Sequence, residues 1–126
     1  MAVELNHTIV HARDKREAAE FFSTILELPE PVPYGPFLGV DTGNGVTLDF
    51  ADDHDPTFRP QHYAFLVSES EFDQIWQRIR ERGLTFWADP FHTKENQINT
   101  NDGGRGLYWD DPDGHNLEII TVPYGG

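Results

Sequence analysis

Two segments of the chain carry apolar residues at helical spacing. Asp14 and Glu17 form an acidic variant of the capping box, which predicts a helix start. The helix must end before Pro29, because proline disfavours helical geometry in the residue that precedes it. The apolar positions of this first helix follow the i, i+3, i+4, i+7 pattern of one buried face and are Ala18, Phe21, Phe22 and Ile25.

The second helical pattern lies past the middle of the chain. Ser70 is the expected N-cap, and Gly83 stands where a left-handed C-cap is common. The apolar positions between them are Phe72, Ile75, Trp76 and Ile79. We interpret the aromatic residues of both helices as core packing rather than as a binding site.

The remaining apolar runs predict strands. A hairpin is expected at residues 37–51, turning through Thr42–Gly45, where glycine and asparagine supply the positive φ of tight turns. Residues 29–36 are rich in proline and predict an extended connection, and residues 52–60 read as an acidic surface linker. The other predicted strands are residues 4–12, 61–67, 84–88, 105–109 and 116–122, the last two joined by a turn at 110–114.

The order of elements repeats within one domain. Residues 1–58 and 59–126 each read as a strand, a helix and then two or three strands. His7 and His62 lie early in the first strand of their halves, and Asp49 and Glu118 lie in the closing strands, each between two apolar residues. A carboxylate in such a setting costs several kcal/mol to desolvate unless it is paired, hydrogen-bonded or bound to a cation.

Two histidines and one carboxylate are the ligands of the facial triad, which holds a divalent metal and leaves its opposite side open. Strand alternation places His7 with Leu5, Ile9 and His11, and it places His62 with Ala64 and Leu66. Both histidines therefore belong to faces that are otherwise mainly apolar. If both faces line the concave side of a curved sheet, His7, His62, Glu118 and Asp49 converge.

The amino-acid composition excludes several classes of binding partner and metal ligand. The formal net charge of −13 repels nucleic-acid phosphates and anionic membranes, so neither is expected as a partner. The chain has no cysteine, so any metal must be held by nitrogen and oxygen. The N-terminal residues lack the features of a signal peptide, and no apolar run is long enough to span a bilayer, which predicts a cytoplasmic protein.

Three stretches carry a resemblance to a known family: LNHTIVHA, QHYAFLV and GGRGLYWDDPDGHNLEIIT. The third is the most specific, with a glycine-rich approach, an aromatic pair, an Asp-Pro-x-Gly turn and then Glu118. The chain resembles a single-module member of the vicinal oxygen chelate superfamily. That superfamily includes glyoxalase I, extradiol dioxygenases, fosfomycin-resistance transferases and bleomycin-resistance binding proteins.

The resemblance implies an α+β fold, in which paired βαβββ modules form a cup-shaped mixed sheet with two helices outside. It assigns the metal ligands to His7, His62 and Glu118 and places Asp49 near the position of a fourth ligand. It also implies a homodimer in which one subunit supplies His7 to a site that the other completes. The implied cofactor is a divalent ion, Fe²⁺ first, with Mn²⁺, Zn²⁺ or Ni²⁺ as alternatives.

The implied activity is that of a glyoxalase-like or extradiol dioxygenase-like enzyme, acting on a small substrate that chelates the metal through adjacent oxygens. Tyr108 lies ten residues before Glu118, where a tyrosine of the ring-cleaving dioxygenases assists catalysis. The acid–base histidine of those enzymes has no clear counterpart, and His92 is the nearest substitute. His11 is a further candidate for moving protons. The alternative function is a non-catalytic natural-product binding protein of the bleomycin-resistance type, although that subgroup lacks the ligand trio.

Overall fold

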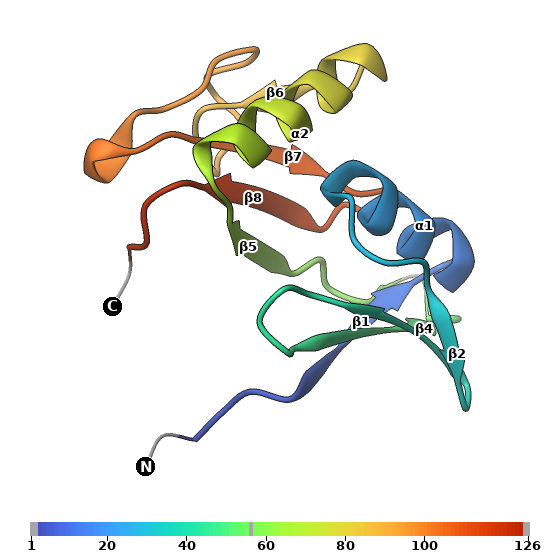
Figure 1. Cartoon of the computed structure of the whole chain (residues 1–126). Coiled ribbons are helices and arrows are strands. Elements are labelled where there is room, and N and C mark those ends of the chain that lie inside the picture. Colours follow the sequence, from blue (N-terminus) through green and yellow to red (C-terminus); the bar gives the residue numbers. More distant parts are fainter. Residues whose placement is uncertain (1–2, 56, 125–126) are drawn as a thin grey trace. The chain divides into compact units, whose positions relative to one another are not determined.

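The computed structural model describes residues 3–55 and 57–124, and Pro56 of the predicted acidic linker lies outside them. The chain divides into two compact units, Met1–Arg59 and Pro60–Gly126 (Figure 1). Within the described residues, each unit contains one α-helix and one four-stranded sheet. The α+β class and the paired βαβββ modules are therefore confirmed.

The first unit contains β1 (His7–Ala12), α1 (Lys15–Leu26), β2 (Val32–Tyr34), β3 (Phe37–Asp41) and β4 (Thr47–Asp52). The sheet order is β1-β4-β3-β2, with β1 parallel to β4 and the other neighbours antiparallel. The hairpin of β3 and β4 confirms the predicted turn. The proline-rich connection contributes the short edge strand β2, which the sequence pattern did not predict as a strand.

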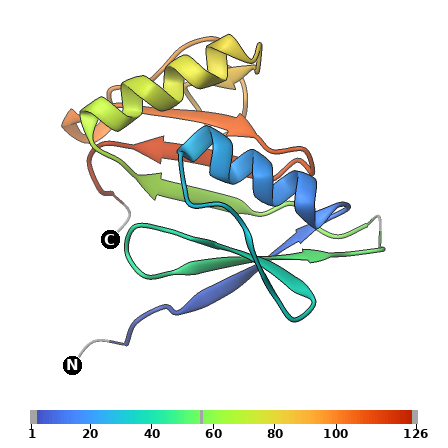
Figure 2. The same cartoon turned by 45° about the vertical axis from the view of Figure 1, so that its right-hand side comes forward.

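Helix α1 begins and ends where its local chemistry allows. The side chain of Asp14 accepts hydrogen bonds from the backbone N–H groups of Arg16 and Glu17, so it satisfies donors that have no partner within the helix. The helix ends at Leu26, before Pro29 as predicted, and Glu27 takes a left-handed conformation. Its apolar face packs on β3 and β4 (Figure 2).

The second unit contains β5 (His62–Leu66), α2 (Glu69–Glu81), β6 (Phe86–Trp87), a 3₁₀ turn (Asn101–Gly103), β7 (Gly106–Asp110) and β8 (Asn116–Ile120). The sheet order is β5-β8-β7-β6, and β5 is parallel to β8. The core of this unit includes Phe72, Ile75 and Ile79 of α2 and Leu107, Trp109, Leu117 and Ile119 of the sheet. No helix among residues 3–55 and 57–124 is both long and apolar enough to span a membrane.

Two details of the second unit correct the sequence prediction. The predicted strand at 84–88 is only Phe86–Trp87, because Ala88 pairs instead with the backbone of Lys94. The N-cap of α2 is Ser68 and not Ser70. Ser68 and Glu71 form a complete capping box, in which each side chain binds the backbone N–H of the other residue.

The internal repeat extends to strand register. In both units a histidine begins the first strand, and the residue two positions later pairs with a carboxylate of the last strand. These residues are His7, Ile9 and Asp49 in the first unit and His62, Ala64 and Glu118 in the second. Because side chains two residues apart share a face, each histidine lies on the same sheet face as the carboxylate of its own unit.

We predict that Ser68→Ala lowers the free energy of unfolding by about 1 kcal/mol, because it leaves helix donors without a cap. Urea unfolding monitored by circular dichroism measures this change. The matched control is Ser70→Ala, two residues further along in the exposed first turn, which removes no cap and improves helix propensity. An equal loss of stability in both variants would contradict the assignment of the cap.

Candidate functional site

Glu118 is the centre of a polar cluster in the second unit. It lies in the middle of β8, and its side chain is only 1% exposed. Its neighbours Leu117 and Ile119 point to the opposite face and are fully buried in the core. On its own face, Glu118 pairs across the strands with Ala64 of β5 and Tyr108 of β7. The sheet therefore holds this carboxylate between two neighbouring strands.

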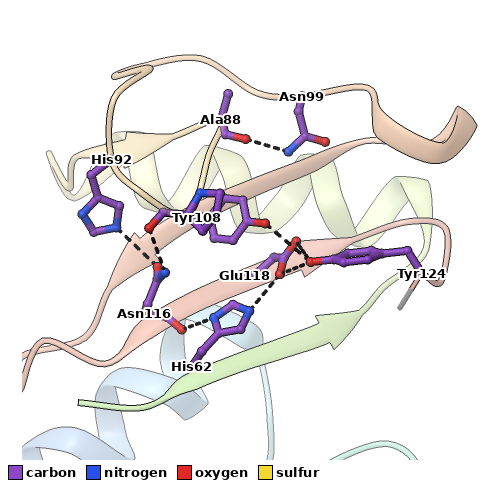
Figure 3. A network of polar contacts seen from close by, with 9 residues as sticks. His62, Ala88, His92, Asn99, Tyr108, Asn116, Glu118 and Tyr124 are labelled. Atoms are coloured by element: carbon purple, nitrogen blue, oxygen red, sulfur yellow. Dashed lines mark hydrogen bonds and ion pairs between the residues drawn. The ribbon is translucent and has the colours of Figure 1, made fainter. Parts of the chain in front are cut away.

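His62 reaches Glu118 from β5 with a defined ring orientation. Its Nδ1 lies 2.8 Å from the main-chain oxygen of Asn116, and its Nε2 lies 3.1 Å from Oε1 of Glu118 (Figure 3). The main-chain oxygen can only accept, so Nδ1 carries a proton and Nε2 of a neutral ring is a lone pair. A lone pair then faces a carboxylate oxygen. Either a second ring proton or a cation bound to both atoms satisfies this contact.

His62 Nε2 and Glu118 Oε1 are spaced as two ligands of one divalent ion. A backbone carbonyl that fixes the Nδ1–H tautomer and leaves Nε2 as the donor is the usual arrangement around metal-binding histidines. Two donors at about 2.1 Å from one ion and about 90° apart are separated by about 3.0 Å. The separation of 3.1 Å between His62 Nε2 and Glu118 Oε1 agrees with that value.

Two tyrosines complete the surroundings of Glu118. The Tyr124 hydroxyl lies 2.7 Å from Oε1 and 2.8 Å from Oε2 and donates to the carboxylate. The Tyr108 hydroxyl lies 3.5 Å from that of Tyr124. Burial, the Tyr124 hydroxyl and the Glu118 carboxylate raise the pKa of Tyr108 far above its ordinary value. Burial is also the largest cause of the raised pKa of Tyr124. Both phenols therefore keep their protons at neutral pH.

A small pocket opens beside these groups. Its volume is about 100 Å³, which is space for a few water molecules or a small ligand group. Glu118 and both tyrosines line it together with the loop that precedes β7. The remaining lining residues are Asn99, Asn101, Asp102, Arg105, Ile120 and Val122. The second unit thus presents a buried carboxylate to a polar cavity.

His92 lies at the other end of the same network. Its ring stacks on Trp87 at a centroid distance of 3.7 Å, and its Nε2 is 3.3 Å from Oδ1 of Asn116 and 3.4 Å from Oδ1 of Asp110. Burial raises the pKa of Asp110, and the charge of His92 opposes that rise. Figure 3 shows His92 beside Asn116, whereas the tyrosine hydroxyls gather at Glu118. His92 therefore contacts this network through Asn116, and its part in proton transfer stays a prediction.

The first unit carries the other predicted residues. His7 is exposed, and its Nδ1 lies 2.7 Å from the side-chain oxygen of Asn6. Asp49 is buried on the face that it shares with His7. His11 lies four residues beyond His7 on β1, about 13 Å along the strand, and pairs with Asp53 at 3.1 Å.

In each unit, two of the predicted ligands lie on the same face of the sheet. They are His7 and Asp49 in the first unit and His62 and Glu118 in the second. Among residues 60–124, no third histidine or acidic side chain completes a metal site with His62 and Glu118. That all four ligands meet around one ion stays a prediction.

Sequence reasoning missed Asn116 and Tyr124. Asn116 acts through its main-chain oxygen, which any residue would supply, and through an amide that binds His92 and the main-chain oxygen of Pro90. Tyr124 follows the last strand with no periodic relation to Glu118. The available signal for Asn116 was a polar residue two positions before Glu118 in the same predicted strand, and Tyr124 had no such signal.

The loop between β6 and β7 is held by its own hydrogen bonds. The Asp89 carboxylate accepts from the backbone N–H groups of Thr93 and Lys94, and Asn99 donates to the main-chain oxygen of Ala88. Arg105, at the end of this loop, forms ion pairs with Glu69 and Asp73 of α2. Its guanidinium is therefore already neutralised by acidic partners.

Comparison with known proteins identifies relatives of the whole chain. Residues 4–119 match the family model described as the Glyoxalase/Bleomycin resistance protein/Dioxygenase superfamily. The "Glutathione transferase FosA" of Serratia marcescens is 30% identical over 94% of this chain and 81% of its own length. The "Metallothiol transferase FosB" of Shouchella clausii is 29% identical over 93% of this chain and 79% of its own length.

Two solved structures are more similar to this chain than the two transferases are. "Oxidase ChaP-H1" is 63% identical with a TM-score of 0.96 and covers 99% of this chain and 100% of its own. "Oxidase ChaP-H2" is 58% identical with a TM-score of 0.96, covering 100% of this chain and 98% of its own. The relatives are thus named as transferases and oxidases, which are enzymes.

We predict that Gly104→Ala lowers the free energy of unfolding by about 1–3 kcal/mol through overpacking. An added Cβ would lie 2.6 Å from Thr121 Oγ1 and 2.6 Å from Val122 Cγ2, in the segment that leads to Tyr124. Urea unfolding measures the loss. The control is Gly43→Ala, where an added Cβ meets nothing within 4 Å. A Gly104 variant as stable as the control would show that the segment after β8 does not pack there.

Proposed function

Because the chain belongs to the Glyoxalase/Bleomycin resistance protein/Dioxygenase superfamily, we propose that it is a metal-dependent enzyme acting on a small substrate with two adjacent oxygens. The observation that carries the proposal is the contact of His62 Nε2 with Glu118 Oε1, a donor pair with the spacing of two neighbouring metal ligands. A carboxylate that is 1% exposed and faces an oriented imidazole is consistent with a cation site.

We assign the ligands to His62 and Glu118, completed by His7, with Asp49 as a fourth candidate. The support for His7 is the repeat, because it occupies in the first unit the register position of His62 in the second. A homodimer whose subunits share ligands belongs to the same proposal. Two histidines and one carboxylate would leave open positions for a chelating substrate.

When bound, the divalent ion supplies Lewis acidity that favours loss of protons from a chelating substrate. The protein residues do the rest. Asn116 keeps His62 in the tautomer whose Nε2 is free, and β7 and β8 hold Tyr108 beside Glu118. Because Tyr108 stays protonated, it serves as a hydrogen-bond donor to a substrate oxygen and not as a base. His92 and His11 remain candidates for proton transfer.

We further propose that the reaction is an oxidation with molecular oxygen. The support is the similarity to two proteins named as oxidases, at 63% and 58% identity, against about 30% for the transferases. Fe²⁺ is the proposed metal, because facial-triad sites that use oxygen hold iron. Mn²⁺, Zn²⁺ or Ni²⁺ would instead suit a lyase or isomerase of the glyoxalase type. The pairing of Arg105 with Glu69 and Asp73 disfavours a strongly anionic substrate.

We predict that His62→Ala and Glu118→Ala each weaken Fe²⁺ or Mn²⁺ binding at least about a hundredfold, because each removes one of only a few ligands. Isothermal titration with the ion alone measures the affinity. His7→Ala is expected to weaken it comparably, whereas Asp49→Ala tests the fourth ligand. The control is His54→Ala, an exposed histidine of the linker. Unchanged affinity in His62→Ala would refute the ligand assignment.

We also predict oxygen uptake. Protein loaded with Fe²⁺ under anaerobic conditions is expected to consume oxygen when catechols or other vicinal dioxygen compounds are added, as an oxygen electrode would show. Tyr108→Phe should lower the rate about 10²-fold or more while it keeps the metal, because it removes only the hydroxyl donor. Metal binding without turnover of any oxygen-dependent kind would favour the glyoxalase-like reaction. Ligand binding that needs no metal would favour the sequestering protein of the bleomycin-resistance type.

A further inference from the structure

The segment after β8 carries a polar residue that lies beyond the match to the family model. That match ends at residue 119, and Tyr124 follows five residues later. Nevertheless its hydroxyl lies within 2.8 Å of both oxygens of the most deeply buried carboxylate of the second unit. Half of the Tyr124 residue is exposed, at 51%, so burial of its ring alone does not account for its position.

The local structure directs Tyr124 to this place. The backbone N–H of Thr121 donates to the main-chain oxygen of Arg105, and the Thr121 hydroxyl accepts from the backbone N–H of Arg105. Gly104 has no side chain, which lets Val122 pack directly on its Cα. The chain is thus fixed two residues before Tyr124, and Tyr124 enters the pocket beside Tyr108.

Tyr124 is placed to control how Glu118 presents its oxygens. In Figure 3 the carboxylate lies between His62 on one side and the Tyr124 hydroxyl on the other. Without Tyr124, the carboxylate would keep the His62 contact at 3.1 Å and the hydrogen bond with the Tyr108 hydroxyl, and the terminal torsion of a glutamate side chain is broad and easily turned. A donor on the side away from His62 holds Oε1 towards Nε2 of that residue.

We propose that Tyr124 is a positioning residue, which orients Glu118 as a metal ligand through its hydroxyl. The proposal rests on the proposed function, because it needs Glu118 to bind a metal. Hydrogen-bond partners of ligating carboxylates typically contribute 10–100-fold to metal affinity.

The test uses the full chain and Co²⁺ alone as the probe, since its visible absorption reports ligand geometry. Tyr124→Phe is expected to raise the Kd for Co²⁺ about tenfold and to change the absorption bands of the bound ion. Tyr124→Ala should raise the Kd at least as much. Tyr34→Phe is the matched control, because Tyr34 is an exposed tyrosine of the edge strand β2. Its Kd and spectrum should equal those of the wild type.

The thermal midpoint of the metal-free protein separates positioning from packing. A midpoint that falls in Tyr124→Phe while the Kd and the spectrum stay unchanged would overturn the proposal, because it would show a structural role only. Tighter Co²⁺ binding would also overturn it and would make Tyr124 a competitor of the metal. If neither wild type nor Tyr34→Phe binds Co²⁺, both the proposed function and the role of Tyr124 are refuted. If both bind as tightly as Tyr124→Phe, only the role of Tyr124 fails.

Discussion

The second unit is organised around one electrostatic requirement, the stabilisation of a carboxylate that is only 1% exposed. Desolvating such a group costs several kcal/mol. Its apolar neighbours in the strand point to the opposite face of the sheet, so they do not offset that cost. The compensation comes from three other segments: β5 brings His62, β7 brings Tyr108, and the chain after β8 brings Tyr124. The pairing of β5 and β7 on either side of β8 is what allows these groups to meet.

The same register in the first unit produces a different environment. Asp49 pairs across the strands with Gly39, where Glu118 pairs with Tyr108. A Cβ at Gly39 would lie 3.3 Å from the Asp49 carboxylate, so the first unit has neither the hydroxyl donor nor much room for one. The two units therefore share the positions of a histidine and a carboxylate, but Tyr108 and Tyr124 beside the carboxylate belong to the second unit.

The sequence predicted the features that depend on periodicity and on local chemistry. Helical spacing located both helices, and alternation placed His62 and Glu118 on faces where the register brings them together. It failed where a choice depends on tertiary context. The N-cap of α2 was instead a missed local signal, because Ser68 has Glu71 three residues later at the spacing of a capping box, whereas Ser70 has Asp73 there. The contact of Tyr124 with Glu118 depends on how residues 121 and 122 pack on the loop before β7, and no sequence period encodes that packing.

The His62 tautomer links the fold to the chemistry. Its ring lies between a main-chain oxygen, which accepts only, and a carboxylate, so both nitrogens face acceptors. A structural histidine would more simply place one nitrogen on a donor, as His115 does when its Nδ1 accepts from the backbone N–H of Gln61. His115 is fully buried in the same unit, whereas the side chain of His62 is 46% exposed. The contrast within one unit favours His62 as the residue that is arranged to receive a cation from solvent.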